Sequence, residues 1–133
     1  MKSKTEIINI YFSLLENFST DIDSYKEILH EKFKQKEFPN ALNKNGQESN
    51  FNETMQRLAV GKNMLINQTY DIVKTYESNE SHIAVEAIWS GKIKNEIGPF
   101  KTGQMLKAHF CIICEFENNK IIFQKNYDCF DPF

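Results

Sequence analysis

Three polar side chains lie at alternate positions near the end of the chain, at Gln124, Asn126 and Asp128 within IIFQKNYDCF. This segment has the alternation of a β-strand, in which residues two apart share a face, so the three side chains form one polar row. Beside an apolar cavity, a carboxyl group such as that of Asp128 has a raised pKa and suits general acid–base catalysis. The alternative role for Asp128 is structural, as a strand-end carboxylate that binds a backbone N–H group or Lys125.

The preceding segment, QMLKAHFCIICEF at 104–116, predicts the strand that pairs with this polar row. One face of that strand is wholly apolar and the other is mixed: Ala108, Phe110, Ile112, Cys114 and Phe116 against His109, Cys111, Ile113 and Glu115. We expect the apolar face, the polar row and Ile122 to face the same cavity, since a few polar groups in an apolar cavity are typical of a small-molecule site. The predicted ligand pocket contains Gln124, Asn126, Trp89, Phe110 and Ile112, and also His109 if a bulge in AHFC turns it inward.

Three helices are predicted in the first half of the chain. Ser3 and Glu6 have the spacing of a capping box, and an apolar stripe follows at Ile7, Tyr11, Leu14, Leu15 and Phe18. A second helix is expected within 19–33, with a stripe at Ile22, Tyr25, Ile28, Leu29 and Phe33, and a third begins at Asn50 with Glu53 three residues later. A buried tyrosine such as Tyr11 needs a partner for its hydroxyl group, and a pocket ligand could supply one.

From residue 66 the pattern has period two and predicts strands over 66–77, 82–93, 104–116 and 121–130, with a turn at 78–81. Helices followed by long strands predict an α+β fold, with the helices on one face of a mainly antiparallel sheet. The length of 133 residues suits one domain, 1–133.

Composition excludes several classes of function. The net charge is −2 and the lysines are spread along the chain, so no basic surface for nucleic acid is expected. No apolar run is long enough to span a membrane, and no signal-peptide cleavage site follows the first residues, so we expect a cytoplasmic protein. Cys111 and Cys114 would point to opposite strand faces and the three histidines lie on separate elements, so neither a metal nor another cofactor is predicted.

The order of these elements resembles the nuclear transport factor 2-like superfamily, and within it the SnoaL-like polyketide cyclases and ketosteroid isomerases. The resemblance rests on IYFSLLENFSTDIDSYKEILHEKF, VEAIWSGKI and the final hairpin KTGQMLKAHF…FENNKIIFQKNYDCFDPF, and it covers nearly the whole chain. It implies a cone-shaped α+β barrel with a strongly curved sheet, a pocket between helices and sheet, and a homodimer formed through the sheet.

The resemblance also assigns positions. Tyr11 lies where ketosteroid isomerases have the tyrosine that donates to the enolate oxygen, and Glu37 lies near their catalytic base. Their second oxyanion donor falls on Ile112. The acid–base aspartate of the cyclases falls on Asn126 and their histidine also on Ile112. The chain therefore matches neither catalytic set.

Three functional hypotheses follow. The first is proton transfer on a mostly apolar carbonyl or polycyclic substrate, with Asp128 or Glu37 as the base and Tyr11 and Asn126 as oxyanion donors. The second is a protein that binds a hydrophobic ligand without turnover, through Asn126, Tyr11 and Trp89. The third is a dimeric scaffold module whose outer sheet face contains Cys111, Ile113, Phe123 and Tyr127.

Overall fold

The two long helices begin at the capping boxes that the sequence predicts. Helix α1 spans Lys4–Glu16 and helix α3 spans Phe51–Met64. At α1, the Ser3 hydroxyl accepts from the Glu6 backbone N–H and the Glu6 carboxylate accepts from that of Ser3. Asn50 and Glu53 make the same reciprocal pair at α3. Each box satisfies two backbone donors that would otherwise lack partners, and this fixes where the helix begins.

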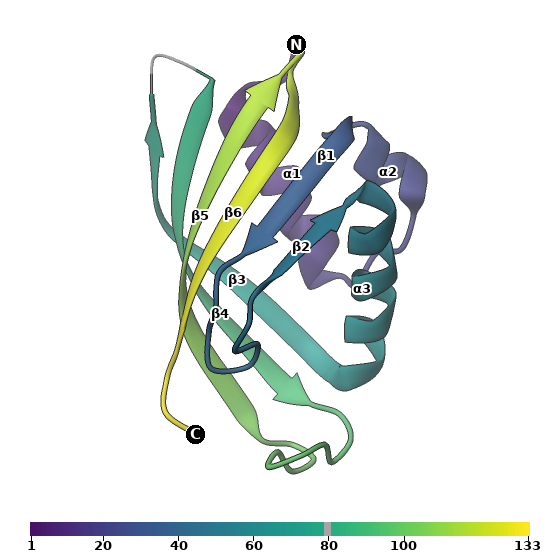
Figure 1. Ribbon diagram of the computed structural model, residues 1–133, viewed down its shortest axis with the longest axis vertical. Helices are drawn as coiled ribbons and strands as arrows, with labels where there is room; N and C mark the ends of the chain where they lie inside the picture. Colours follow the sequence, from purple (N-terminus) through teal and green to yellow (C-terminus); the bar gives the residue numbers. More distant parts are fainter. Residues whose placement is uncertain (79–80) are drawn as a thin grey trace.

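The computed structural model describes residues 1–78 and 81–133. The turn expected at 78–81 includes residues 79 and 80, which lie outside the described residues. The strands are β1 Leu29–Glu37, β2 Gln47–Asn50, β3 Leu65–Glu77, β4 His82–Ile93, β5 Met105–Glu117 and β6 Lys120–Phe130. They form one sheet in the order β2-β1-β6-β5-β4-β3, and the helices lie on one side of it (Figure 1). All described neighbours are antiparallel except β1 and β6, so the predicted α+β fold with a mainly antiparallel sheet is confirmed.

The second predicted helix is mostly wrong. Helix α2 spans only Ile22–Lys26, and the chain from Leu29 onward is strand β1. Strand β1 pairs with β6 on one side and β2 on the other, so its backbone groups bond within the sheet. Leu29 and Phe33 are both buried in this strand, because residues four apart share a face in a strand as they do in a helix.

The predicted faces of β5 are observed. Ala108, Phe110, Ile112, Cys114 and Phe116 are buried under the helices, in a core that also contains Ile7, Ile8, Tyr11, Tyr25 and Phe33. On β6, Gln124 and Asn126 are buried on the same side, but Ile122 is not. Glu115 pairs with Phe123 and Phe116 with Ile121, so Ile122 is an extra residue in a bulge. The bulge turns Ile121 into the core in place of Ile122, which corrects the expected position of Ile122.

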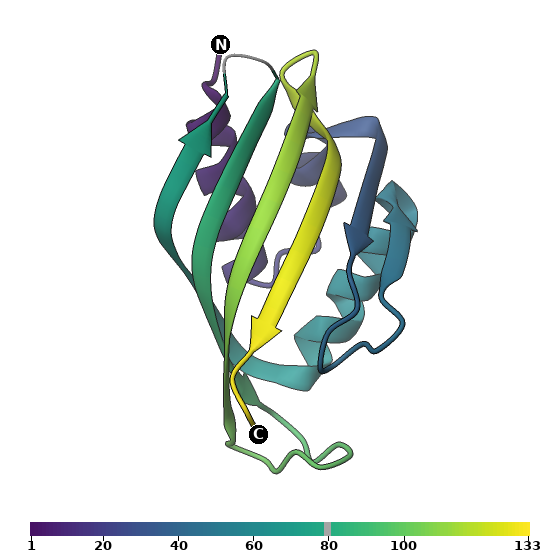
Figure 2. The ribbon, with the colours of Figure 1, turned by 60° about the vertical axis from the view of Figure 1, so that its left-hand side comes forward.

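The other face of β3–β6 carries no helix within the described residues (Figure 2). It presents Cys111, Ile113 and Phe123, which are partly exposed, and Tyr127, which is 39% exposed and stacks on Phe38 with ring centroids 4.5 Å apart. None of the described helices is long and apolar enough to cross a membrane.

Candidate functional site

The candidate site is a pocket of about 580 Å³ between α3, the inner face of the sheet and the 94–104 connection. One part of it is apolar and one part is polar. The apolar part includes Leu58, Leu65, Tyr70, Trp89, Ile93, Ile97, Pro99, Phe100, Leu106, Phe110 and Phe130. The polar part includes Gln35, Glu37, Asn40, Thr54, Arg57, Asn126 and Asp128.

The polar row of β6 reaches the pocket where its neighbour β1 leaves the sheet. Glu37, the last residue of β1, pairs with Asn126, and the Phe38 N–H donates to the Asn126 carbonyl. Asp128 lies two residues further along β6, where the described pairing continues only with Phe110 of β5. Its side chain lines the pocket together with that of Asn126, on the same face of β6.

Asp128 is a largely buried carboxyl group with a raised pKa. Burial raises the pKa of its carboxyl group to about 7; the negative charge of Glu37 adds to this increase, and the positive charge of Arg57 opposes it. The Oδ1 atom of Asp128 is buried and has no hydrogen-bond partner within 1–78 and 81–133. Thr54 also lines the pocket, and its Oγ1 atom is likewise buried without a hydrogen-bond partner among the described residues. Unpartnered buried polar atoms are uncommon in folded proteins, so two of them around one pocket favour a ligand site.

Glu37 is tied to a neighbouring cation and is not a free base. Its Oε1 accepts from Arg57 Nη2 at 2.7 Å and its Oε2 accepts from Asn40 Nδ2 at 2.8 Å. Arg57 reaches it from α3 and also donates to the Ser49 hydroxyl at 3.3 Å. These two contacts use both carboxylate oxygens of Glu37. Glu37 therefore acts on the site mainly through its charge.

Tyr11 and Gln124 lie behind the pocket and contact it through Asn126. The Tyr11 hydroxyl donates to Gln124 Oε1 at 2.7 Å, and Gln124 Nε2 donates to Asn126 Oδ1 at 2.7 Å. Tyr11 is 2% exposed, Gln124 2% and Asn126 8%, and of the three only Asn126 lines the pocket. The expected direct contact of Tyr11 with a ligand is therefore not supported by its position.

The aromatic wall is held in place by specific contacts. Trp89 Nε1 donates to Gln68 Oε1 at 2.9 Å, and its ring stacks on Phe110 at 5.8 Å between centroids. Phe130 meets both rings edge-on. Gly91 makes room for the indole, because a Cβ atom at residue 91 would lie 2.5 Å from Trp89 Cζ2.

Two other predicted pocket residues lie elsewhere. His109 lies on the outer face of the sheet, where its side chain is 63% exposed and its Nε2 is 3.9 Å from Asp131 Oδ1. The bulge in AHFC that would have turned it inward is absent, because β5 pairs with β4 and β6 in regular register there. Ile112 faces inward but lies in the core and not along the pocket.

Sequence reasoning missed several pocket residues. Arg57 is the only arginine of the chain and lies within helix α3. Its uniqueness was the one feature of the sequence that could have marked it as a site residue. Thr54, Tyr70, Phe130 and the segment Ile97–Phe100 carried no comparable signal, because their approach depends on tertiary structure.

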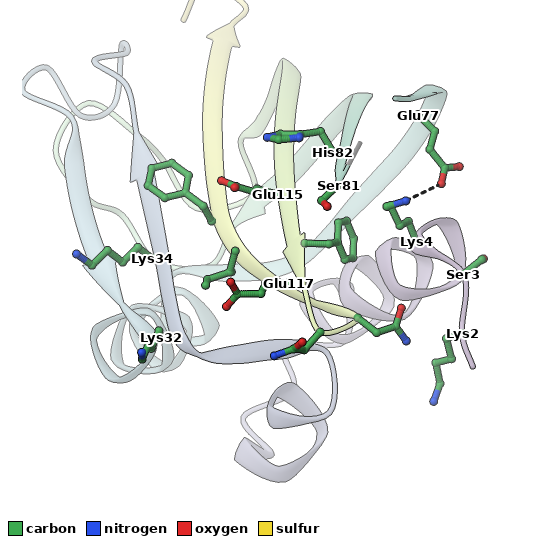
Figure 3. Close-up of a pocket in the computed structure, with 15 residues that line it drawn as sticks. Lys2, Ser3, Lys4, Lys32, Lys34, Glu77, Ser81, His82, Glu115 and Glu117 are labelled. Carbon is green, nitrogen blue, oxygen red and sulfur yellow. Dashed lines mark hydrogen bonds and ion pairs between the residues drawn. The ribbon is translucent and has the colours of Figure 1, made fainter. Parts of the chain in front are cut away.

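A second and larger hollow, of about 890 Å³, lies at the other end of the sheet (Figure 3). It is lined by charged side chains of both signs, including Lys32, Lys34 and Glu115, which are exposed, and by the Lys4–Glu77 ion pair at 3.2 Å. Phe116, Ile122 and Phe123 also line it, but most of its lining is polar or charged, unlike the mostly apolar walls of a typical small-molecule site. Size alone therefore does not make it the functional site.

The described residues contain no cluster of three or more His, Cys, Asp or Glu side chains that could hold a metal ion.

The fold matches solved structures across nearly the whole chain. IdmH from Streptomyces antibioticus, a candidate polyketide cyclase, has a TM-score of 0.78 and 11% identity over 96% of this chain and 92% of its own. A SnoaL-like polyketide cyclase from Agrobacterium tumefaciens has a TM-score of 0.71 and 10% identity over 96% and 92%. A protein with a ketosteroid isomerase-like fold from Catenulispora acidiphila, solved in complex with trimethylamine, has a TM-score of 0.72 and 16% identity over 94% and 86%.

At these identities the comparisons define the fold. The chain is structurally similar to SnoaL-like polyketide cyclases, ketosteroid isomerase-like proteins and nuclear transport factor 2-like proteins, as the resemblance in the sequence predicts. No protein-family model matches the sequence. No curated protein matches it either.

Proposed function

We propose that the pocket binds a mostly apolar small molecule and that Asp128 exchanges a proton with it, in the manner of an isomerase or cyclase. The observation that carries this proposal is the Asp128 carboxyl group, which lines an aromatic pocket, has one buried oxygen without a described partner and has a pKa raised to about 7. A carboxyl group with that pKa has both protonation states available at neutral pH, as a general acid–base catalyst requires.

Asn126 supplies a second polar group beside Asp128. The two residues lie on one face of β6 two positions apart, which spaces their side chains by about 6.6 Å along the strand. If the carbonyl oxygen of a ligand is bound at Asn126, the carbon next to that carbonyl group would lie toward Asp128. The Asp128 carboxylate would then remove a proton from this carbon. The similarity in fold to a SnoaL-like cyclase and to a ketosteroid isomerase-like protein supports this class of reaction, although a fold by itself does not define an activity.

Deuterium exchange tests this proposal directly. Fused-ring ketones are incubated with the protein in D2O, and mass spectrometry follows deuterium incorporation next to the carbonyl group. We expect exchange faster than in buffer, and a decrease of about 10²-fold or more in Asp128→Asn. Asp71→Asn, at an exposed position of β3, is the matched control and should exchange at the wild-type rate. Equal exchange with and without protein would exclude proton abstraction from these ketones.

The second candidate function is binding without turnover. Two observations favour it. The Tyr11 hydroxyl already donates a hydrogen bond to Gln124. Residue 112 is an isoleucine, at the position where the ketosteroid isomerases and polyketide cyclases have a catalytic group. Trp89 is the only tryptophan of the chain and lies in the pocket wall, so its fluorescence reports on this site alone. Steroids, fused-ring ketones, terpenoid epoxides and fatty acids are each added to the protein in increasing concentration while the Trp89 fluorescence is measured. Saturable quenching without deuterium exchange or other turnover would favour the binding function.

We also propose that the helix-free face of the sheet pairs with a second copy of this chain. Partly exposed apolar side chains at Cys111, Ile113 and Phe123 on its central strands support this proposal, because such patches commonly mark interfaces. Light scattering should then give a dimer mass for the wild type and a monomer mass for Ile113→Glu. A monomeric wild type would exclude this use of the face.

A further inference from the structure

A chain of three buried side chains connects α1 to the pocket. Tyr11 donates to Gln124 and Gln124 donates to Asn126, each at 2.7 Å. The residues are far apart in sequence, since 113 positions separate Tyr11 from Gln124. Each is at least 92% buried, so water does not replace these partners freely.

The tyrosine hydroxyl decides which way the two amides face. In the observed arrangement its proton goes to Gln124 Oε1, and Gln124 Nε2 then donates to Asn126 Oδ1. If both amides were reversed, Gln124 Nε2 would donate to the tyrosine oxygen and the hydroxyl proton would lose the Gln124 acceptor that it has in the structure. A buried donor without a partner is costly, so the observed direction is the favoured one. Burial also raises the pKa of Tyr11 well above its ordinary value, so the hydroxyl keeps its proton at neutral pH.

This direction leaves the amide nitrogen of Asn126 for the pocket. Asn126 Oδ1 is used by Gln124, whereas Asn126 Nδ2 donates to no described side chain or backbone carbonyl. We propose that Tyr11 and Gln124 are positioning residues that hold the Asn126 amide nitrogen toward the pocket, so that the ligand group bound there is a hydrogen-bond acceptor such as a carbonyl oxygen. This inference rests on the proposed function, in which a carbonyl oxygen binds at Asn126, and adds the two residues that orient the Asn126 amide toward it.

A tyrosine in ring contact with Tyr11 provides a matched control. Tyr25 is fully buried, and its ring lies edge-on to Tyr11 at 6.4 Å between centroids. Its hydroxyl donates to the Ser19 carbonyl at 2.8 Å and has no contact with Gln124 or Asn126. Tyr11→Phe and Tyr25→Phe thus each remove one buried hydroxyl group, but only the first removes the constraint on the amides.

The first experiment uses the ligand-free protein. Hydrogen exchange of the side-chain amides is measured by ¹⁵N NMR in the wild type, Tyr11→Phe and Tyr25→Phe. We expect the Asn126 amide protons to exchange quickly in the wild type and in Tyr25→Phe. In Tyr11→Phe the exchange of the Asn126 amide protons should be slower. Without the tyrosine hydroxyl both amides can turn, so that Asn126 Nδ2 donates to Gln124 Oε1. Equal Asn126 exchange in the wild type and Tyr11→Phe would overturn the inference.

The second experiment uses trans-1-decalone and trans-decalin, which share a carbon skeleton and differ in the carbonyl oxygen. Trp89 fluorescence should show the wild type binding the ketone about tenfold more tightly, as one additional hydrogen bond to the ligand would give. Tyr11→Phe should lose this preference while its decalin affinity stays unchanged, and Tyr25→Phe should keep it. Retention of the full preference in Tyr11→Phe would contradict the positioning role.

The two experiments separate this inference from the proposed function. If the wild type binds neither compound, the proposed pocket function fails for this ligand class, and amide exchange still decides the role of Tyr11. If Tyr11→Phe does not fold, Gln124→Met replaces it, since methionine has a similar volume and carries no amide. Gln124→Met should likewise lose the preference for the ketone, and a retained preference would contradict the inference.

Discussion

Replacing Asp128 by asparagine is expected to stabilise the protein at high pH and to leave its stability unchanged at low pH. The pKa of this carboxyl group is about 7 in the folded protein, against an ordinary value of 3.8 that applies to the unfolded chain. The folded state therefore binds the proton more tightly than the unfolded state. The contribution of Asp128 to stability is fully present below pH 3.8 and is lost as the pH rises to about 7.

The size of this loss follows from the two pKa values. At 1.36 kcal/mol for each pKa unit, the wild type loses about 4 kcal/mol through Asp128 between these limits. Asparagine has the shape of the protonated acid and does not ionise. The free energy of unfolding of Asp128→Asn should therefore exceed that of the wild type by an amount that increases up to pH 7 and is constant above it.

Urea unfolding of both proteins from pH 4 to pH 8 measures this difference, and subtraction removes the contributions of the other carboxylates. The two m-values should agree, so that the difference reflects stability and not a change in the unfolded state. Asp71→Asn controls for the same chemical change at an exposed position. A difference that does not vary with pH, or a wild type that becomes relatively more stable as the pH rises, would refute the burial argument.

Three further predictions concern the surroundings of Asp128 and the pocket wall. Glu37→Gln removes the negative neighbour and should lower the pKa of Asp128, seen as a shift of its ¹³C carboxyl titration to lower pH; an unchanged titration would exclude the proposed coupling. Arg57→Gln removes the opposing positive charge, so the same titration should shift to higher pH, and the protein should lose about 1–3 kcal/mol because Glu37 is left without its ion pair. Gly91→Ala should displace the Trp89 ring, cost about 1–3 kcal/mol in urea unfolding and shift the tryptophan emission; an unchanged emission would show that the ring accommodates the methyl group.

The parts of the fold that the sequence predicted are those with long and regular patterns. Both capping boxes mark helix starts, and the strict alternation of 105–117 identifies the core face of β5. The second helix failed because the four-residue spacing of Leu29 and Phe33 fits a strand as well as a helix, and pairing with β6 decided between them. A single extra residue in β6 likewise reversed the expected position of Ile122.

The candidate site was predicted only in part, for a similar reason. Strand parity placed Asn126, Asp128 and Phe110 on one face, where the structure has them. The hydrogen bond from Tyr11 to Gln124 and the approach of Arg57 to Glu37 depend on how α1 and α3 pack on the sheet. Local spacing contains no information on such contacts, so the engaged hydroxyl group and the ion pair could not be foreseen.

The most direct test of the account is the titration of Asp128 itself, by ¹³C NMR of its side-chain carboxyl group from pH 3 to pH 9, assigned by its absence in Asp128→Asn. The midpoint should be about 7. Trans-1-decalone should change this midpoint, because the ketone would occupy the pocket beside the carboxyl group. A midpoint near 3.8, unaffected by the ketone, would mean that Asp128 is a solvated carboxylate and would contradict an acid–base role.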